Sequence, residues 1–205
     1  MQKNILVLSK EVLRPKEYLS CYGSKIYNTK NIDKLASEGT IFTNFYTAAP
    51  STSMSFTSMF SGLYPFETKR KEYKIVDNFN QCKTVSDILD ERGYDVHVLF
   101  GSKWYNTSHK RSRVFCDNTI YHPLDGIHQQ IGTHYTTGEK VKAQKDAKPL
   151  EIIYNEFKEI MKDPQKPVFA WFHAPHGFAG RKGYGSDIDL FDELLGMLFD
   201  FFNYD

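Results

Sequence analysis

Polar side chains that could do chemistry follow several apolar, strand-like runs of this sequence. Glu11 comes just after the run Ile5–Leu8, and the hydroxyl of Thr52 follows a stretch rich in β-forming residues. In a parallel α/β sheet, ligands bind beyond the carboxyl ends of the strands. We therefore expect Glu11 and Thr52 to converge at one edge of a sheet with three residues that follow later apolar runs: Lys103, His173 and His176.

The cluster of hydroxyls around Thr52 is the most informative of these groups. A helix that starts here would present free N–H groups and partial positive charge, which attract phosphate or sulfate. The hydroxyl of Thr52 or Ser53 could then be a nucleophile, if a metal ion or a base lowers its pKa. The alternative is that one of these two residues only caps the helix, which is a frequent role for Thr and Ser.

Each of the other candidates also has a structural alternative. Glu11 could bind a hard divalent cation or be a solvated loop carboxylate, and Lys103 could contact an anion or be an ordinary surface lysine. His173 and His176 are three residues apart, whereas a zinc-binding helix needs histidines at i and i+4 with a glutamate between them. Because Pro175 lies between them, we expect a loop, in which each histidine could be structural or functional.

The elements that must position these residues alternate between strands and helices. Asn31 can cap a helix that Gly39 ends, and Gly62 ends a second helix within residues 50–65. This alternation favours an α/β fold with a mostly parallel sheet. The other predicted elements are strands at 5–8, 40–49, 96–100 and 168–173, and helices from Val85, over 150–162 and over 187–202.

Residues of about 105–149 show little periodicity, and we expect them to form an irregular surface excursion. Long loops in compact domains are often functional. His97, by contrast, alternates with valines in a predicted strand and should face a polar edge. Nothing in the sequence singles out His122, which lies in the excursion.

The composition excludes several classes of protein. The chain has 205 residues, of which 40% are hydrophobic, so wholesale disorder is excluded. A formal net charge of +1 argues against a nucleic-acid binder, and no run of 18 apolar residues predicts a membrane span. With no signal peptide visible, we expect a cytoplasmic protein by default, and three scattered cysteines fit a reducing compartment.

Five segments, in this order, resemble the sulfatase family of the alkaline-phosphatase superfamily. The resemblance covers most of the chain except residues of about 105–150. The segments are NILVLSKEVLRPKEYLSCYG with TKNIDKLASEGTIFTNFYTAAP, TSMSFTSMFSGLYP, ERGYDVHVLFGSKW, PVFAWFHAPHGF and YGSDIDLFDELLGMLFD. The resemblance implies an alkaline-phosphatase-like three-layer α/β/α sandwich around a mostly parallel sheet. It also implies a single partial sulfatase-like N-terminal domain over residues 1–205.

The resemblance also implies roles for the candidate residues. Glu11 falls on the first acidic metal ligand of the family and Thr52 on its nucleophile, which also binds the metal. Lys103 falls on the lysine that contacts the transferred anionic group, and His176 on the histidine beside the leaving group. His173 and Ser53 would lie beside the substrate. The implied cofactor is a divalent metal ion, with Ca, Mn and Zn as the candidates.

The sequence departs from the sulfatase pattern at the nucleophile. Thr52, Met54 and Phe56 stand where sulfatases have Cys or Ser, Pro and Arg. A threonine nucleophile resembles the phosphoglycerol and phosphoethanolamine transferases of the same superfamily. The implied function is a metal-dependent hydrolase or transferase acting on sulfate or phosphate esters of small molecules, glycans or lipids. The alternative is an inactive, truncated member that at most binds an anionic ligand.

The last segment, LLGMLFDFFNYD, reads as an apolar helix. In the family, a strand and an Asp-His-Gly turn with further metal ligands follow this helix, so we expect the fold to be incomplete at its C-terminal end. We also expect Phe199, Phe201 and Phe202 to be exposed, which predicts self-association through this helix.

Overall fold

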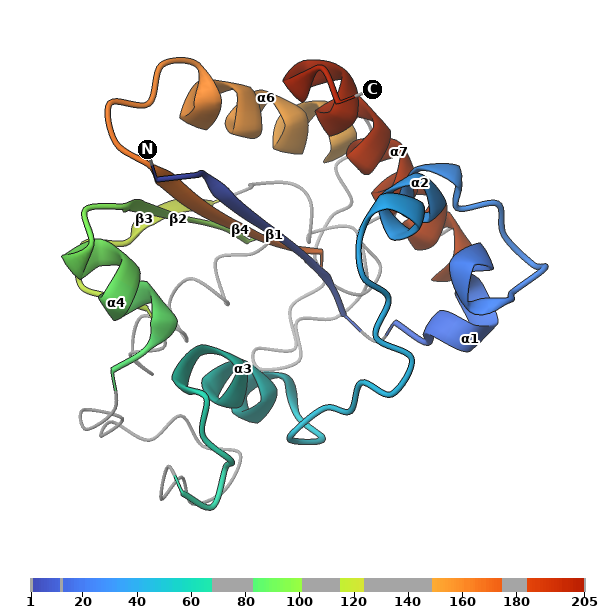
Figure 1. Cartoon of the computed structure of the whole chain (residues 1–205), viewed down its shortest axis with the longest axis horizontal. Helices are drawn as coiled ribbons and strands as arrows, with labels where there is room; N and C mark the ends of the chain where they lie inside the picture. The colour runs from blue at the N-terminus through green and yellow to red at the C-terminus, as the bar shows by residue number, and fades with distance from the viewer. Residues whose placement is uncertain are drawn as a thin grey trace, which may run out of the picture. The chain divides into compact units, whose positions relative to one another are not determined.

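The computed structural model describes residues 2–11, 13–67, 83–100, 115–123, 149–174 and 184–204. Within these residues, four strands form one sheet in the order β1-β4-β2-β3 (Figure 1). Strands β2 and β3 pair in parallel, with His97 opposite Ile120. The predicted mixed α/β architecture with a parallel sheet is therefore confirmed. The strands are β1 (Ile5–Lys10), β2 (Asp95–Phe100), β3 (Ile120–Pro123) and β4 (Val168–Ala174).

Two helices end at the glycines that the sequence marks as their ends, Gly39 and Gly62. Helix α3 ends before Gly62, which adopts a φ of 70° that favours glycine. The helices of the described residues are α1 (Pro15–Tyr18), η1 (Ser20–Tyr22, 3-10), α2 (Lys30–Glu38), α3 (Thr52–Ser61), α4 (Val85–Glu91), α6 (Pro149–Met161) and α7 (Tyr184–Phe202). None of these helices is long and apolar enough to cross a membrane.

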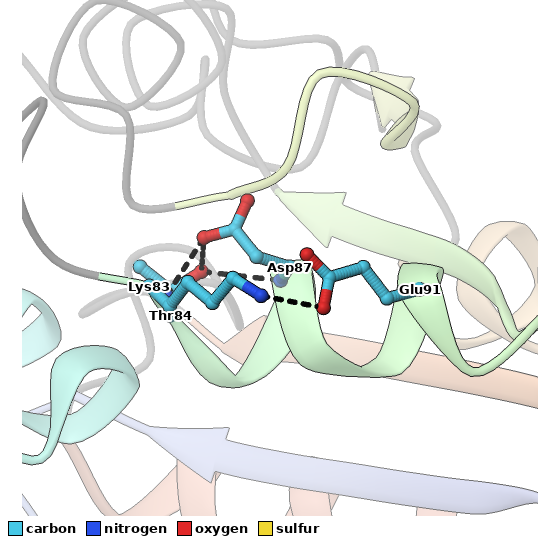
Figure 2. A network of polar contacts seen from close by, with 4 residues as sticks. All are labelled: Lys83, Thr84, Asp87 and Glu91. Atoms are coloured by element: carbon cyan, nitrogen blue, oxygen red, sulfur yellow. Dashed lines mark hydrogen bonds and ion pairs between the residues drawn. The ribbon is translucent and has the colours of Figure 1, made fainter.

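Helix α4 starts with a reciprocal capping box. The Asp87 backbone N–H donates to Thr84 Oγ1 at 3.3 Å, and the Thr84 backbone N–H donates to Asp87 Oδ2 at 2.7 Å (Figure 2). Both N–H groups would otherwise lack an intrahelical partner. Lys83 and Glu91 form an ion pair of 2.7 Å along the same helix, and both side chains are more than half exposed.

The chain divides into two compact units, and the division falls inside strands β1 and β4. The first unit comprises Met1–Leu8, Phe45–Pro123 and Asp163–Phe172. The second unit comprises Ser9–Asn44, Leu124–Lys162 and His173–Asp205.

An aromatic cluster holds α3 in the first unit. The ring of Trp171, which is fully buried on β4, lies 4.8 Å from Phe56 and 4.6 Å from Phe60 on α3. Phe115 completes the cluster, 4.7 Å from the Phe60 ring in an edge-on arrangement. Burial of each such side chain contributes roughly 1.5–3 kcal/mol, so this cluster fixes the position of α3.

In the second unit, α7 packs against α2 and α6, and an α7 carboxylate caps α2. Asp192 Oδ1 accepts hydrogen bonds from the backbone N–H groups of Asn31 (3.0 Å) and Ile32 (2.8 Å). The Asn31 side-chain amide donates to Asp192 Oδ2 at 3.0 Å. Asn31 is therefore not the N-cap, because Thr29 holds that position and Asp192 satisfies the free N–H groups.

Two expectations about strands are wrong. Residues 40–49 form no strand and pair with none of the four strands of the described residues, and the side chains of Phe45 and Tyr46 are more than 80% exposed. The predicted excursion contains a strand, β3, which pairs with β2.

The C-terminal helix is better covered than its composition suggests. The Phe199 ring stacks on Tyr204 at 4.8 Å, and the Phe201 ring lies edge-on to Tyr154 at 6.3 Å. Both phenylalanines are half-buried, and Phe202 remains 41% exposed. The expected exposure is thus wrong for two of the three rings, and self-association stays a prediction.

Candidate functional site

Glu11 lies directly after β1, as the sequence predicts. Its backbone N–H donates to the carbonyl oxygen of Ala174, the last residue of β4, at 2.9 Å. The half-buried Glu11 is therefore held at the carboxyl ends of two strands, where an α/β sheet offers its ligand sites.

His173 lies beside Glu11 in the second unit and is almost fully buried on β4. Ser9 Oγ and His173 Nδ1 are 2.9 Å apart, and the tautomer of the imidazole decides which group donates. This bond fixes the orientation of the ring. The structure thus brings together two of the predicted site residues, Glu11 and His173.

A buried ion pair that the sequence analysis missed lies at the same strand ends. Lys10 Nζ lies 3.6 Å from Asp187 Oδ2, and neither side chain is exposed. Lys10 Nζ also donates to the backbone carbonyl oxygen of Glu11 at 3.1 Å. Burial lowers the pKa of Lys10, and the Asp187 and Glu11 carboxylates oppose this shift. The sequence feature that could have drawn attention to this position is a lysine, in place of an apolar residue, at the end of β1.

Asp187 lies in the first turn of α7, where the partial positive charge of the helix start favours a carboxylate. The sequence places Asp187 only at the start of the predicted helix, without a role. Lys10 and Asp187 are too far apart in sequence for a local pattern to pair them.

In the first unit, Thr52 is the first residue of α3 and is half-buried. The N-cap is Ser51, with extended backbone at φ −120° and ψ 147°. The alternative that Thr52 or Ser53 caps the helix is therefore wrong. The backbone of Ser53 belongs to the first turn, whereas its side chain lies outside the described residues.

The start of α3 is fixed by hydroxyl contacts. Thr47 Oγ1 donates to the Ala49 carbonyl oxygen at 2.9 Å and lies 3.0 Å from Ser55 Oγ in the first turn. Ser51 Oγ is buried and has no hydrogen-bond partner within the described part of the chain. A buried hydroxyl beside free helix N–H groups is suited to an oxyanion.

The described residues do not by themselves make a metal centre. No group of three or more His, Cys, Asp or Glu side chains that could hold a metal ion occurs among them. Lys103 and His176 lie outside the described residues. Glu11 belongs to the second unit and Thr52 to the first.

A histidine pair that sequence reasoning also missed lies on β2 and β3. His97 Nδ1 and His122 Nε2 are 2.9 Å apart, and the two rings stack with centroids 5.2 Å apart. Burial first, and then the neighbouring His122, lower the pKa of His97 to about 4, and Asp95 opposes the shift. The pairing depends on β3, which carries no periodic signal in the sequence.

Comparison with known proteins assigns the family. The sulfatase family model matches residues 3–196. This chain belongs to the sulfatase family. Over 93 residues it is 33% identical to an N-acetylgalactosamine-6-O-sulfatase of Bacteroides thetaiotaomicron, a stretch that covers 42% of this chain and 17% of that relative. The matched stretch thus spans less than a fifth of that relative's length.

Solved structures share the fold of this sulfatase-family chain. The phosphonate monoester hydrolase of Agrobacterium radiobacter matches with a TM-score of 0.69 and 14% identity, over 97% of this chain and 59% of that one. Ps i-CgsB in complex with k-i-k-neocarrahexaose matches with a TM-score of 0.69 and 19% identity, over 98% and 55%. A zinc complex of the C-terminal periplasmic domain of EcEptC from Escherichia coli matches with a TM-score of 0.61 and 13% identity, over 98% and 59%. The expected alkaline-phosphatase-like α/β fold is confirmed.

Proposed function

We propose that this sulfatase-family chain carries the nucleophile of a hydrolase or transferase that acts on sulfate or phosphate esters, and that Thr52 is this nucleophile. The observation that carries the proposal is the position of Thr52 as the first residue of α3, directly after the N-cap Ser51. Family membership supports the reaction class.

In the proposed reaction, Thr52 Oγ1 attacks the sulfur or phosphorus atom and the bond to the leaving oxygen breaks. The Thr52 proton passes to a base, and His176 protonates the leaving oxygen. The group is then transferred from Thr52 to water in a hydrolase, or to an acceptor hydroxyl in a transferase. The N–H groups at the start of α3 and the Lys103 ammonium stabilise the charge that develops on the non-bridging oxygens.

The buried Ser51 hydroxyl supports an oxyanion at this helix start. It lies one residue before Thr52 and has no partner within the described residues, so it can donate a hydrogen bond to a transferred group. Ser53 and His173 are proposed as further substrate contacts.

A divalent ion, with Glu11 and Thr52 as ligands, is proposed from the family resemblance alone. The zinc complex of a structurally similar protein supports a divalent ion in relatives of this fold. When bound, such an ion would lower the pKa of the attacking hydroxyl.

The substrate class is proposed as a small-molecule, glycan or lipid ester. A protein of similar fold binds an oligosaccharide, neocarrahexaose, which supports a glycan. The threonine at the nucleophile position favours phosphate esters, because the resemblance at this residue is to phosphotransferases.

The test compares Thr52→Ala with Thr52→Ser, which keeps a hydroxyl, and with Ser61→Ala at the other end of α3. Aryl sulfates, phosphate monoesters and phosphodiesters are assayed with Mn²⁺, Zn²⁺ or Ca²⁺. We expect turnover in the parent chain, at least about 100-fold less in Thr52→Ala, partial activity in Thr52→Ser and full activity in Ser61→Ala. Mass spectrometry of the acid-quenched reaction should find the transferred group on Thr52.

Equal turnover in the parent chain and Thr52→Ala would exclude Thr52 as the nucleophile. Anion binding without turnover in either protein would instead support the alternative, an inactive family member that binds an anionic ligand.

A further inference from the structure

The carboxyl end of β1 carries a positive charge at the point where the family resemblance places a metal ligand. Lys10 immediately precedes Glu11, and its Nζ turns back onto the Glu11 carbonyl oxygen at 3.1 Å. The ammonium lies within 3.6 Å of Asp187, and both side chains are completely buried. The cation is therefore held in one place by two contacts.

The burial of this pair makes its charges strong local determinants of ion binding. Two opposite charges withdrawn from water are screened far less than a surface pair. The Glu11 carboxylate also attracts the Lys10 ammonium. Asp187 thus already has a cation from the protein itself, and the Glu11 carboxylate attracts the same ammonium.

We propose that Lys10 is an internal counter-cation for Glu11 and Asp187, which holds down the affinity of this strand edge for divalent metal ions. The inference rests on the placement of Glu11 in the proposed function, but it concerns ion binding and not turnover. A divalent ion that approached Glu11 would meet the repulsion of the Lys10 ammonium. Removing that ammonium should free both carboxylates for the ion.

Isothermal titration of the full 205-residue chain with MnCl₂ tests the proposal. We expect Lys10→Met to bind Mn²⁺ at least about tenfold more tightly than the parent chain, because like charges a few ångströms apart repel by more than this at the permittivity of a partly buried site. The matched control is Lys166→Met, which removes an ion-paired lysine 3.0 Å from Asp95 on the surface. This control should leave the Mn²⁺ affinity unchanged.

Lys10→Met leaves Asp187 buried without its cation, and the variant could fail to fold. A second comparison avoids this problem. It sets Asp187→Asn against Lys10→Met/Asp187→Asn, because both variants lack the Asp187 charge and differ only at residue 10. The double variant should then bind Mn²⁺ more tightly than Asp187→Asn.

The proposal would be overturned if Lys10→Met bound Mn²⁺ no more tightly than the parent chain, or if the double variant bound it no more tightly than Asp187→Asn, provided that the compared proteins fold. So would absence of Mn²⁺ binding in all folded variants. Binding is read without substrate, so a failure here is distinguishable from a failure of Thr52 to act as the nucleophile.

Discussion

The Asp192 carboxylate on α7 caps α2 by accepting the backbone N–H of Ile32 at 2.8 Å. A helix start is a natural place for an anion, and at α2 the protein fills it with its own side chain. The start of α3 differs, because Ser51 there leaves a buried hydroxyl without a partner among the described residues.

Asp192→Asn should destabilise the protein by about 2 kcal/mol, because it removes charge-assisted hydrogen bonds from a buried helix start. The free energy of unfolding from urea titration measures the loss. Asp189→Asn, at an exposed position on the same helix, is the control and should change stability by less than about 0.5 kcal/mol. A similar loss in both variants would mean that the cap contributes little.

Gly196→Ala should also be destabilising, although alanine favours helices. A Cβ at this position would lie only 2.8 Å from the Asn31 amide nitrogen, so the net loss should be roughly 1–3 kcal/mol. Combining it with Asn31→Ala removes the clash, and the double variant should show a coupling energy in a urea double-mutant cycle. Strict additivity of the two changes would contradict the close approach.

Thr84→Ala should cost about 1 kcal/mol, because it removes the side-chain acceptor of the capping box. Lys83→Ala, one residue earlier, breaks the exposed ion pair with Glu91 and should cost no more than about 0.5 kcal/mol. Thermal unfolding monitored by circular dichroism compares the two variants. A larger effect at Lys83 than at Thr84 would contradict this ranking.

His97 should make the protein less stable as the pH falls from about 6.5 towards 4. The pKa of His97 is about 4 in the folded chain, and an unfolded histidine has a pKa near 6.5. Between these values the unfolded state binds the extra proton, so the stabilisation is complete above about pH 6.5 and is lost on acidification.

Urea midpoints at pH 7 and pH 5 measure this dependence, and His97→Gln should reduce it. His122→Gln should reduce it in part, because removing the neighbouring imidazole leaves burial as the main cause of the lowered pKa, with Asp95 still opposing it. An unchanged pH dependence in His97→Gln would rule out this residue as the source.

The sequence predicts the elements that carry their own local signals. Helix α3 is predictable because Gly62 marks its end. Strand β2 is predictable because its valines alternate. The sequence places Glu11 after a strand and Thr52 at a helix start, because the predicted strand and helix themselves determine these two positions.

What depends on contacts between distant segments could not be predicted. Residues 40–49 have the composition of a strand but pair with no strand within the described part of the chain, whereas the four residues of β3 form a strand because β2 pairs with them. Nothing near Lys10 in the sequence predicts its ion pair, because Asp187 reaches it only through the packing of α7.

The contacts of Lys34 affect how the helices of the second unit unfold locally. The Lys34 ammonium lies 5.3 Å from the Tyr204 ring and 5.6 Å from the Phe199 ring, and Tyr204 donates a hydrogen bond to Glu38. Both ends of α2 are thus joined to the C-terminal segment, the start by Asp192 in the middle of α7 and the end by Phe199 and Tyr204. In native-state hydrogen exchange, amides of α2 and of the last turns of α7 should become exchangeable together, as one cooperative unit, and not fray separately from the chain end.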